Sequence, residues 1–415
     1  MTKKKLLVSA LFGLGLACTA NAAQTEIRFD GFPDFDSSLK QILPKFYQEN
    51  PDLKVDYVMN NWGDHHNKLT TNLATGSGAG DVVVVDVGRI GAFVNKGGFV
   101  NLSEKYDVDS LADQYAPYAW TQGQGVDGAQ YGIPVDLGPG VLYYRRDVAD
   151  SVGADINKVI HDWDSYIEYG KKLKPKGVYL IASAADVAEA IIYTTVEDGN
   201  GLYFDAQGKS LLQSPRFVKA FETAKKIRDL GLDAKITAWS NEWYEGFKQG
   251  TLATQLSGAW LLGHLKNWMA PDTAGKWGVS NLPDGIYGSW GGSFLVIPKQ
   301  SNKQDQAWTL IKYMATRPDV ELEAFKTIAA FPSLVATYDD SMFDEKIDFL
   351  NGQKARLLFA EVAKNVKPVK PAKGDQVARS IILDAALGEV LDEGKDVKTA
   401  LAEADRILQR RLKAM

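Results

Sequence analysis

Four consecutive valines at positions 82–85 stand between Asp81 and Asp86. A short run that is apolar at every position is typical of a parallel strand that is buried on both faces, because helices cover the two sides of such a sheet. Short β-prone runs such as Glu26–Phe29 and Leu53–Met59 alternate with segments that repeat apolar residues at helical spacing. This alternation predicts an α/β fold.

A glycine-rich segment at 76–80 follows a predicted helix at 64–75 and precedes the valine strand. A loop that cradles phosphate needs the opposite order, in which a strand leads into glycines and then into the N-terminus of a helix. We therefore interpret the glycines as a turn and not as a nucleotide-binding loop.

The N-terminus has the three parts of a secretory signal peptide. A basic stretch, Lys3–Lys5, precedes twelve apolar residues, Leu6–Ala17, which are too few to span a bilayer. Ala20-Asn21-Ala22 has the small residues that signal peptidase requires. We predict that residues 1–22 are a signal peptide, that cleavage follows Ala22 and that the mature protein is exported to the periplasm.

Cys18 is the only cysteine, and it lies within this predicted signal peptide. The mature chain would then have no disulfide, thiolate nucleophile or cysteine–zinc site; lipidation of Cys18 is the alternative. Loss of three lysines leaves 44 basic and 52 acidic residues, a net charge of −8. An acidic chain is a poor match to a nucleic-acid partner, so we expect none.

The ~390 residues that remain exceed one typical domain, so two lobes are expected. The sequence has no internal repeat, low-complexity tract or long linker. Two lobes without a linker are joined by several short crossings, and such a hinge can close around a ligand.

Asp136 is the most informative single residue of the central segment 131–147. It lies between two apolar β-prone runs, and Gly138, Pro139 and Gly140 interrupt the gap between them. A buried carboxylate without a partner is costly, so Asp136 requires one. Sugar hydroxyls could supply it.

Several segments, in order, resemble those of the bacterial extracellular solute-binding proteins that serve sugar ABC importers, specifically the maltose-binding-like family 1. Gly80 and Arg145 depart from the family pattern, in which proline and asparagine are usual. The matching segments are Phe46–Pro51 with Leu53–Val55, Leu69–Gly76 with Gly80–Asp86, Tyr131–Pro134 with Gly140–Tyr144, Asp162–Asp164, Gly258–Trp260, and Gly291–Ser293 with Pro298–Lys299 and Ala307–Trp308.

This resemblance implies a two-lobed, type II periplasmic-binding-protein fold, in which each lobe is a mainly parallel sheet flanked by helices. Residues 23–134 and 291–332 would form the N-terminal lobe, and 135–290 and 333–415 the C-terminal lobe, joined by three crossings. The implied function is that of a monomeric carrier without catalytic activity or a cofactor. It would capture a sugar, expected to be a di- or oligosaccharide, between the lobes and deliver it to a membrane permease.

Sugar recognition needs carboxylates and amides for the hydroxyls and aromatic rings for the C–H faces. From strand ends, crossings and the family pattern, we expect ligand contacts from Asp34, Trp62, Asp86, Arg89, Asp136, Trp260, Trp290, Gly291 and Phe331. Asn61, Glu242 and Arg379 are secondary candidates. Trp239 and Trp243, four residues apart at a predicted helix start, are expected to share a face and pack in the core.

Catalysis and metal binding have weaker support. His65 and His66 are adjacent and would point about 100° apart on a helix, which makes a poor two-ligand metal site. His161 and His264 lie in unrelated segments, and no metalloprotease or nucleophile-elbow motif is present. The alternatives left open are a secreted glycosidase or polysaccharide lyase with a carboxylate pair, and a carrier of polyamine, iron or phosphate.

Overall fold

The computed structural model describes residues 24–197, 199–369 and 372–414, so the predicted signal peptide and Cys18 lie outside the described residues. Within these ranges, seven strands form one sheet with the order β2-β1-β3-β7-β4-β5, and β6 pairs with β4. The strands are β1 (Thr25–Gly31), β2 (Leu53–Met59), β3 (Val82–Asp86), β4 (Gly132–Arg145), β5 (Thr254–Gly258), β6 (Trp277–Ser280) and β7 (Ser289–Val296).

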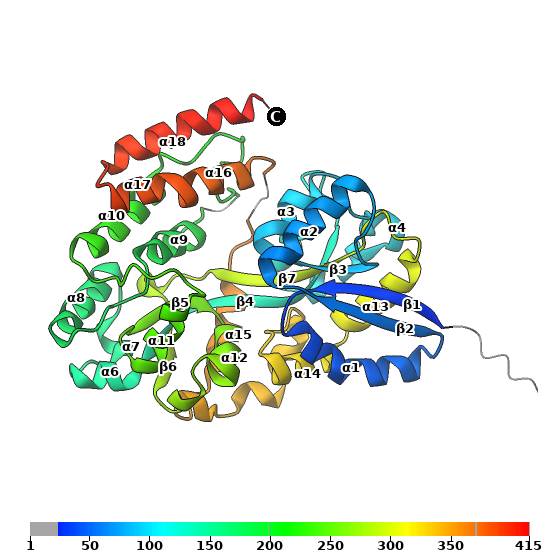
Figure 1. The fold of residues 1–415 in the computed structure, drawn as a ribbon, viewed down its shortest axis with the longest axis horizontal. Coiled ribbons are helices and arrows are strands. Elements are labelled where there is room, and N and C mark those ends of the chain that lie inside the picture. The colour runs from blue at the N-terminus through cyan, green and yellow to red at the C-terminus, as the bar shows by residue number, and fades with distance from the viewer. Residues whose placement is uncertain (1–23, 198, 370–371, 415) are drawn as a thin grey trace, which may run out of the picture.

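Helices cover both faces of the sheet and confirm the α/β class (Figure 1). They are α1 (Phe35–Glu49), α2 (Trp62–Thr75), α3 (Val87–Val94), α4 (Leu102–Tyr106), α5 (Pro117–Gln122), α6 (Arg146–Ser151), α7 (Ile156–Val159), α8 (Trp163–Leu173), α9 (Ala184–Thr194), α10 (Pro215–Asp229), α11 (Asn241–Gln249), α12 (Leu261–His264), α13 (Gln304–Ala315), α14 (Pro318–Ile328), α15 (Ala355–Asn365), α16 (Asp375–Ile381), α17 (Leu387–Asp392) and α18 (Val397–Leu412).

The first half of the molecule contains β1–β3 with α1–α5, α13 and α14. β1 pairs in parallel with β2 and with β3, as the valine run predicts. All four valines of β3 are buried, because one core lies on each side of the sheet. Gly76, in a left-handed conformation, ends α2, so the glycine-rich segment is the predicted turn.

The second half contains β5 and β6 with α6–α12 and α15–α18. Here the strand pairs with β4 are antiparallel, and the parallel connections are single bridges, Tyr179 to Leu252 and Ile181 to Asp233. Apolar patterning identifies strands but does not give their direction, so the residues alone could not predict these antiparallel pairs. One core in this half lies around α8, α9, α10 and α18, and a second lies around α11, α12 and α15.

Two long strands run between the halves (Figure 1). β4 pairs with β7 through its first residues and with β5 and β6 through its last ones. The register of β4 against β7 shifts between Pro134 and Asp136 and again between Leu137 and Pro139. Such irregularities bend a strand and re-aim its side chains, and here they surround Asp136.

A third connection lies beside β4. The amide of Leu137 donates a hydrogen bond of 2.8 Å to the carbonyl of Phe331. Ser333 Oγ lies 3.0 Å from the carbonyl of Pro134. It also lies 2.5 Å from Oε1 of Glu321, a buried residue of α14. These contacts fasten the segment after α14 to the crossing strand.

Candidate functional site

Asp86, Ser293 and Asp136 form one row across three adjacent strands. Ser293 of β7 is the register partner of Asp86 of β3 on one side and of Asp136 of β4 on the other. Neighbouring strands lie about 4.8 Å apart, so two carboxylates face the same strip of sheet with a serine between them. The row lies where β4 and β7 run between the halves.

Burial raises the pKa of Asp136 to about 7, because a charged carboxylate loses its hydration. Hydrogen bonding from Ser293 lowers it in part, and the charge of Asp86 raises it further. Burial also raises the pKa of Asp86. Oδ1 of Asp136 is buried and accepts no hydrogen bond from the protein. A buried oxygen without a partner is rare, and a ligand hydroxyl that reached it would satisfy it.

His66 joins two of the expected site residues to each other. Its Nδ1 lies 2.8 Å from the Trp62 carbonyl, and its Nε2 lies 3.2 Å from the Asp86 amide. A carbonyl only accepts and an amide only donates, so the imidazole is neutral with its proton on Nδ1. Burial lowers the pKa of His66 to about 4, which keeps this form at neutral pH.

Trp62 presents a partly open face in the first half of the molecule. Its side chain is 41% exposed, and its ring lies 4.7 Å from the ring of His66. The Arg89 guanidinium lies 5.1 Å from the Trp62 ring centroid, in a cation–π contact. Asp86 caps α3 through the amide of Gly88 at 2.7 Å. α2 and α3 thus place an indole, a guanidinium and a carboxylate together.

Trp260 lies against the crossing strands from the other half. Its Nε1 donates a hydrogen bond of 2.7 Å to the Trp290 carbonyl. A Cβ on Gly258 or Gly291 would come within 2.4 Å or 2.7 Å of that Nε1, so only glycine leaves room for the indole. The Trp290 ring packs against the core around α8, α9, α10 and α18, where its centroid lies 6.3 Å from that of Tyr193.

Asp34 and His264 meet between the halves. Oδ2 of Asp34 lies 3.4 Å from Nδ1 of His264, and Asp34 adopts a left-handed conformation at φ 80° without capping α1 through its side chain. Rings of Trp239, Trp260 and Trp268 surround the imidazole at 5.5–5.6 Å. Burial lowers the pKa of His264, and the charge of Asp34 opposes that shift.

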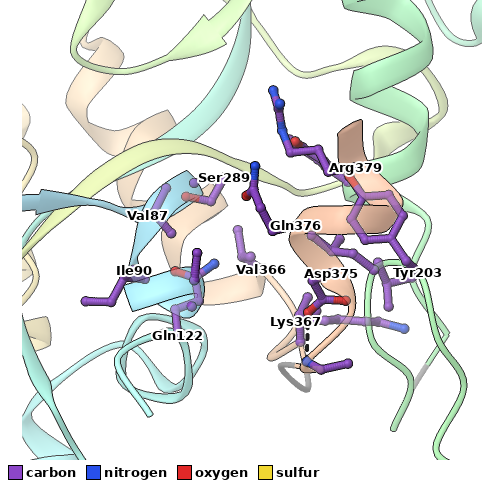
Figure 2. Close-up of a pocket in the computed structure, with 18 of the residues that line it drawn as sticks. Val87, Ile90, Gln122, Tyr203, Ser289, Val366, Lys367, Asp375, Gln376 and Arg379 are labelled. Carbon is purple, nitrogen blue, oxygen red and sulfur yellow. Dashed lines mark hydrogen bonds between the residues drawn. The ribbon is translucent and has the colours of Figure 1, made fainter. Parts of the chain in front are cut away.

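A cavity of about 190 Å³ lies beside the Asp86 end of the row. Figure 2 shows Val87 and Ile90 of α3 on one side of it and Tyr203, Asp375 and Arg379 on the other. Burial raises the pKa of Asp375 to about 7, and its Oδ2 accepts a hydrogen bond of 2.7 Å from the Ala372 amide. The charge of Arg379 lowers the pKa of Asp86 in part, so the two groups belong to one electrostatic environment.

Two expectations about aromatic residues need correction. Phe331 is fully buried among Phe325, Tyr338 and Phe343, so its side chain packs the core and has no surface for a ligand. Trp239 does not share a helix face with Trp243, because α11 begins only at Asn241. Trp243 is buried as expected, but Trp239 is 49% exposed.

His66 and His264 contact several of the expected site residues, which the sequence does not reveal. Each lies beside indoles and next to an aspartate, Asp86 or Asp34. The spacing of His264 four residues from both Trp260 and Trp268 was the available signal. Within the described ranges, no group of three His, Cys, Asp or Glu side chains is placed to hold a metal ion. None of the helices there is long and apolar enough to cross a membrane.

Residues 41–350 match the family model described as bacterial extracellular solute-binding protein. The chain belongs to that family. The lactose-binding protein of Rhizobium radiobacter is 26% identical over 378 residues, covering 86% of each chain. The arabinooligosaccharide-binding protein of Bacillus subtilis (strain 168) is 23% identical over 415 residues, covering 93% of this chain and 94% of the relative. The family is one of binding proteins.

Solved structures of solute-binding proteins share this fold. The ABC transporter associated binding protein from B. animalis subsp. lactis Bl-04, solved in complex with beta-1,6-galactobiose, superposes with a TM-score of 0.77. It is 27% identical, and the match covers 93% of this chain and 97% of that one. The sugar-binding protein MalE from Xanthomonas citri has the same fold at a TM-score of 0.74 and 24% identity, covering 94% and 99%.

Proposed function

We propose that this solute-binding protein captures a carbohydrate between its two halves and delivers it to the membrane permease of an ABC importer. The unpartnered carboxylate oxygen of Asp136 carries the proposal, because it lies in a row with Asp86, which itself interacts with the partly exposed indole of Trp62. Carboxylates bind paired sugar hydroxyls, and indoles cover the apolar face of a pyranose. The relatives that bind lactose and arabinooligosaccharides support sugars that contain galactose or arabinose.

The proposed ligand lies along the row of Asp86, Ser293 and Asp136, between side chains of the first half and side chains of the second half. Trp62, Asp86 and Arg89 would contact it from the first half, and Trp260 and Arg379 from the second. Asp136, on the crossing strand β4, would accept a hydrogen bond from a ligand hydroxyl. Trp290 and Gly291 of β7 would shape the site behind Trp260. Closure of the halves around the sugar would then be a population shift, driven by tighter binding to the closed form.

The proposed lobes keep the boundaries expected from the sequence, 23–134 with 291–332 and 135–290 with 333–415. We also propose a periplasmic, monomeric protein whose first 22 residues are removed. Mass spectrometry of the mature protein tests this directly. A chain that begins at Ala23 is expected, and a diacylglyceryl group on Cys18 would contradict it.

The competing functions receive less support. A polyamine needs carboxylates without neighbouring cations, but the positive charges of Arg89 and Arg379 act on Asp86. A glycosidase needs a carboxyl pair that protonates and attacks one bond, and against it stands the match to a family of solute-binding proteins. We propose that the row binds without catalysis.

A thermal-shift panel of mono- and oligosaccharides, followed by chromatography of the incubated sugars, tests the function. Stabilisation by a sugar that is recovered intact is the expected result, because a ligand that binds only the folded state raises the melting temperature. Recovery of cleaved sugar would establish an enzyme. Stabilisation by spermidine or Fe³⁺ and by none of the sugars would overturn the proposal.

A further inference from the structure

The backbone of β4 is irregular next to Asp136. Pro134 of β4 opposes Phe294 of β7. The neighbouring residue of β7, Ser293, opposes Asp136, so Val135 is an extra residue on the β4 side. Such a bulge leaves the extra residue unpaired and interrupts the ladder of backbone hydrogen bonds. The direction of the Asp136 carboxyl group therefore depends on other contacts of the β4 backbone.

The third connection between the halves, residues 331–334, supplies hydrogen bonds on both sides of Asp136. Ser333 Oγ lies 3.0 Å from the Pro134 carbonyl, which precedes Asp136 on the strand. The amide of Leu137, the residue directly after Asp136, donates a hydrogen bond of 2.8 Å to the Phe331 carbonyl. The position of this connection therefore sets the course of β4 at Asp136.

Glu321 of α14 holds the connection in place. Its Oε1 lies 2.5 Å from Ser333 Oγ, and its Oε2 accepts a hydrogen bond of 2.9 Å from the Leu334 amide. Glu321 is 2% exposed, and Ser333 is fully buried. A buried polar network whose members are all bonded rigidifies the structure around it. The carboxyl group of Glu321 thus determines where the connection lies.

The hydrogen atoms of this network favour a neutral Glu321. The Ser333 hydroxyl has one hydrogen but lies within hydrogen-bond distance of two oxygens, the Pro134 carbonyl and Oε1 of Glu321. A carbonyl and an ionised carboxylate only accept, so that hydrogen could serve only one of them. With a proton on Oε1, Glu321 donates to Ser333, and Ser333 donates to Pro134. We call these two hydrogen bonds the relay. The Leu334 amide still donates to Oε2.

The surroundings of Glu321 agree with the neutral form. Burial raises its pKa to about 8, and the charge of Asp136 on β4 raises it further. The two hydrogen bonds to its carboxyl group and its place in the first turn of α14 oppose this shift in part. Burial raises the pKa values of the phenols beside it, Tyr115 and Tyr338, so neither is charged at neutral pH. Within the described ranges, no basic side chain forms an ion pair with Glu321.

We propose that Glu321 is a positioning residue for the sugar site, whose neutral carboxyl group holds Asp136 in place through Ser333 and the Pro134 carbonyl. Glu321 would not touch the ligand. It would set the direction of Asp136 by fixing the connection that bonds β4 on both sides of that residue. This inference rests on the proposed carbohydrate-binding function and adds a residue that determines affinity from outside the site.

Titration calorimetry tests the relay with lactose and beta-1,6-galactobiose, the sugars named for two relatives. Glu321→Gln should bind as tightly as the wild type at pH 7, because its amide donates to Ser333 and its carbonyl accepts from Leu334. Glu321→Ala and Ser333→Ala each break the relay, and we expect either change to weaken binding roughly fivefold. The double variant should lose no more than either single variant, because both changes remove the same relay.

Val320→Ala is the matched control for folding. Val320 is 4% exposed in the same helix and packs in the core of the first half, away from the relay. The variant should lose stability because it leaves a cavity, and it should keep the affinity of the wild type.

The pH profile of binding is a readout that a merely structural role would not change. Above pH 8 Glu321 of the wild type ionises and the relay loses a hydrogen, whereas the amide of Glu321→Gln does not titrate. We expect the affinity of the wild type to fall below that of Glu321→Gln between pH 7 and pH 9. Asp136 titrates in both proteins, so the difference between them belongs to Glu321. An infrared difference spectrum of the two proteins at pH 6 should show the carbonyl stretch of a neutral carboxylic acid.

Full affinity in Glu321→Ala and Ser333→Ala would overturn the inference and leave the carbohydrate function intact. An equal loss of affinity in Val320→Ala would mean that Glu321 acts only through folding. A carboxylate band in the infrared spectrum would show that Glu321 is ionised and that the relay does not exist. If Glu321→Ala does not fold, Ser333→Ala and the pH profile decide. Absence of binding by the wild type to both sugars and to every sugar of the thermal-shift panel would overturn the inference and the function together.

Discussion

His66 shows how a single buried side chain holds a site together without needing to contact a ligand. It is 2% exposed and connects the Trp62 carbonyl to the Asp86 amide through its two ring nitrogens. His66 therefore fixes the position of Trp62 on α2 relative to Asp86 at the end of β3. Because His66 would act through these two residues, it is a positioning residue.

We expect His66→Ala to weaken sugar binding by about tenfold, because Trp62 and Asp86 lose the shared partner that sets their separation. His65→Ala is the matched control. His65 is 3% exposed on the same helix, but its Nε2 contacts the Val84 carbonyl instead of the site. Both variants should lose stability, and titration calorimetry should show lower affinity only for His66→Ala. An equal loss of affinity in the two variants would mean that His66 acts only through folding.

At the scale of elements, the two crossing strands approach each other so closely that their glycines cannot be replaced. A Cβ on Gly138 of β4 would lie 1.6 Å from the Trp290 carbonyl oxygen, and a Cβ on Gly140 would lie 2.2 Å from the Trp290 ring. The obstacle at Gly138 is backbone, which cannot rotate away. The close approach fixes the position of Trp290 and, through its carbonyl, of Trp260.

Gly138→Ala is therefore expected to destabilise the protein by about 3 kcal/mol or more, because the strands must separate to admit a methyl group. Gly388 of α17 provides the control, since a Cβ there meets no atom within 4 Å. Gly388→Ala should be neutral or stabilise by about 0.5–1 kcal/mol, as expected within a helix. Urea denaturation of the two variants measures the difference. A stable Gly138→Ala variant would show that the crossing is not tightly packed.

Sequence reasoning was most successful where local patterns determine structure. The buried valine strand and the turn at 76–80 follow from an apolar run and from glycine alone. It was wrong for Trp239, because a helical spacing of tryptophans does not reveal that the helix begins after the first of them. It missed the place of His264, because the contact with Asp34 joins residues 230 positions apart. Tertiary contacts of this kind leave no local signal.

For the whole molecule, four carboxyl groups with raised pKa values couple folding to pH. Burial raises the pKa of Asp136, Asp186 and Asp375 to about 7 and that of Glu321 to about 8. In the unfolded chain these groups ionise near pH 4. Above that pH the folded state binds more protons than the unfolded state, so the free energy of unfolding falls as pH rises towards the folded pKa.

We expect the free energy of unfolding to fall between pH 6.5 and pH 8 by on the order of 1 kcal/mol for each of these groups. Below pH 6.5 the buried histidines act in the opposite direction, since the pKa of His66 is lowered to about 4 and its stabilising effect grows as pH rises from there. Glu321→Gln should reduce the slope, because glutamine does not titrate. Urea denaturation at the two pH values measures this, and a slope that is unchanged in Glu321→Gln would show that Glu321 is ionised in the folded protein.

The central claim is that a sugar binds between the halves with Asp136 as a hydroxyl acceptor. Calorimetric titration of the wild type and Asp136→Ala, with the sugar that stabilises the wild type most, tests it most directly. We predict at least a tenfold loss of affinity in the variant, because a hydrogen bond to a carboxylate contributes about 1.5–3 kcal/mol. A variant that melts cooperatively and binds the sugar as tightly as the wild type would contradict the claim.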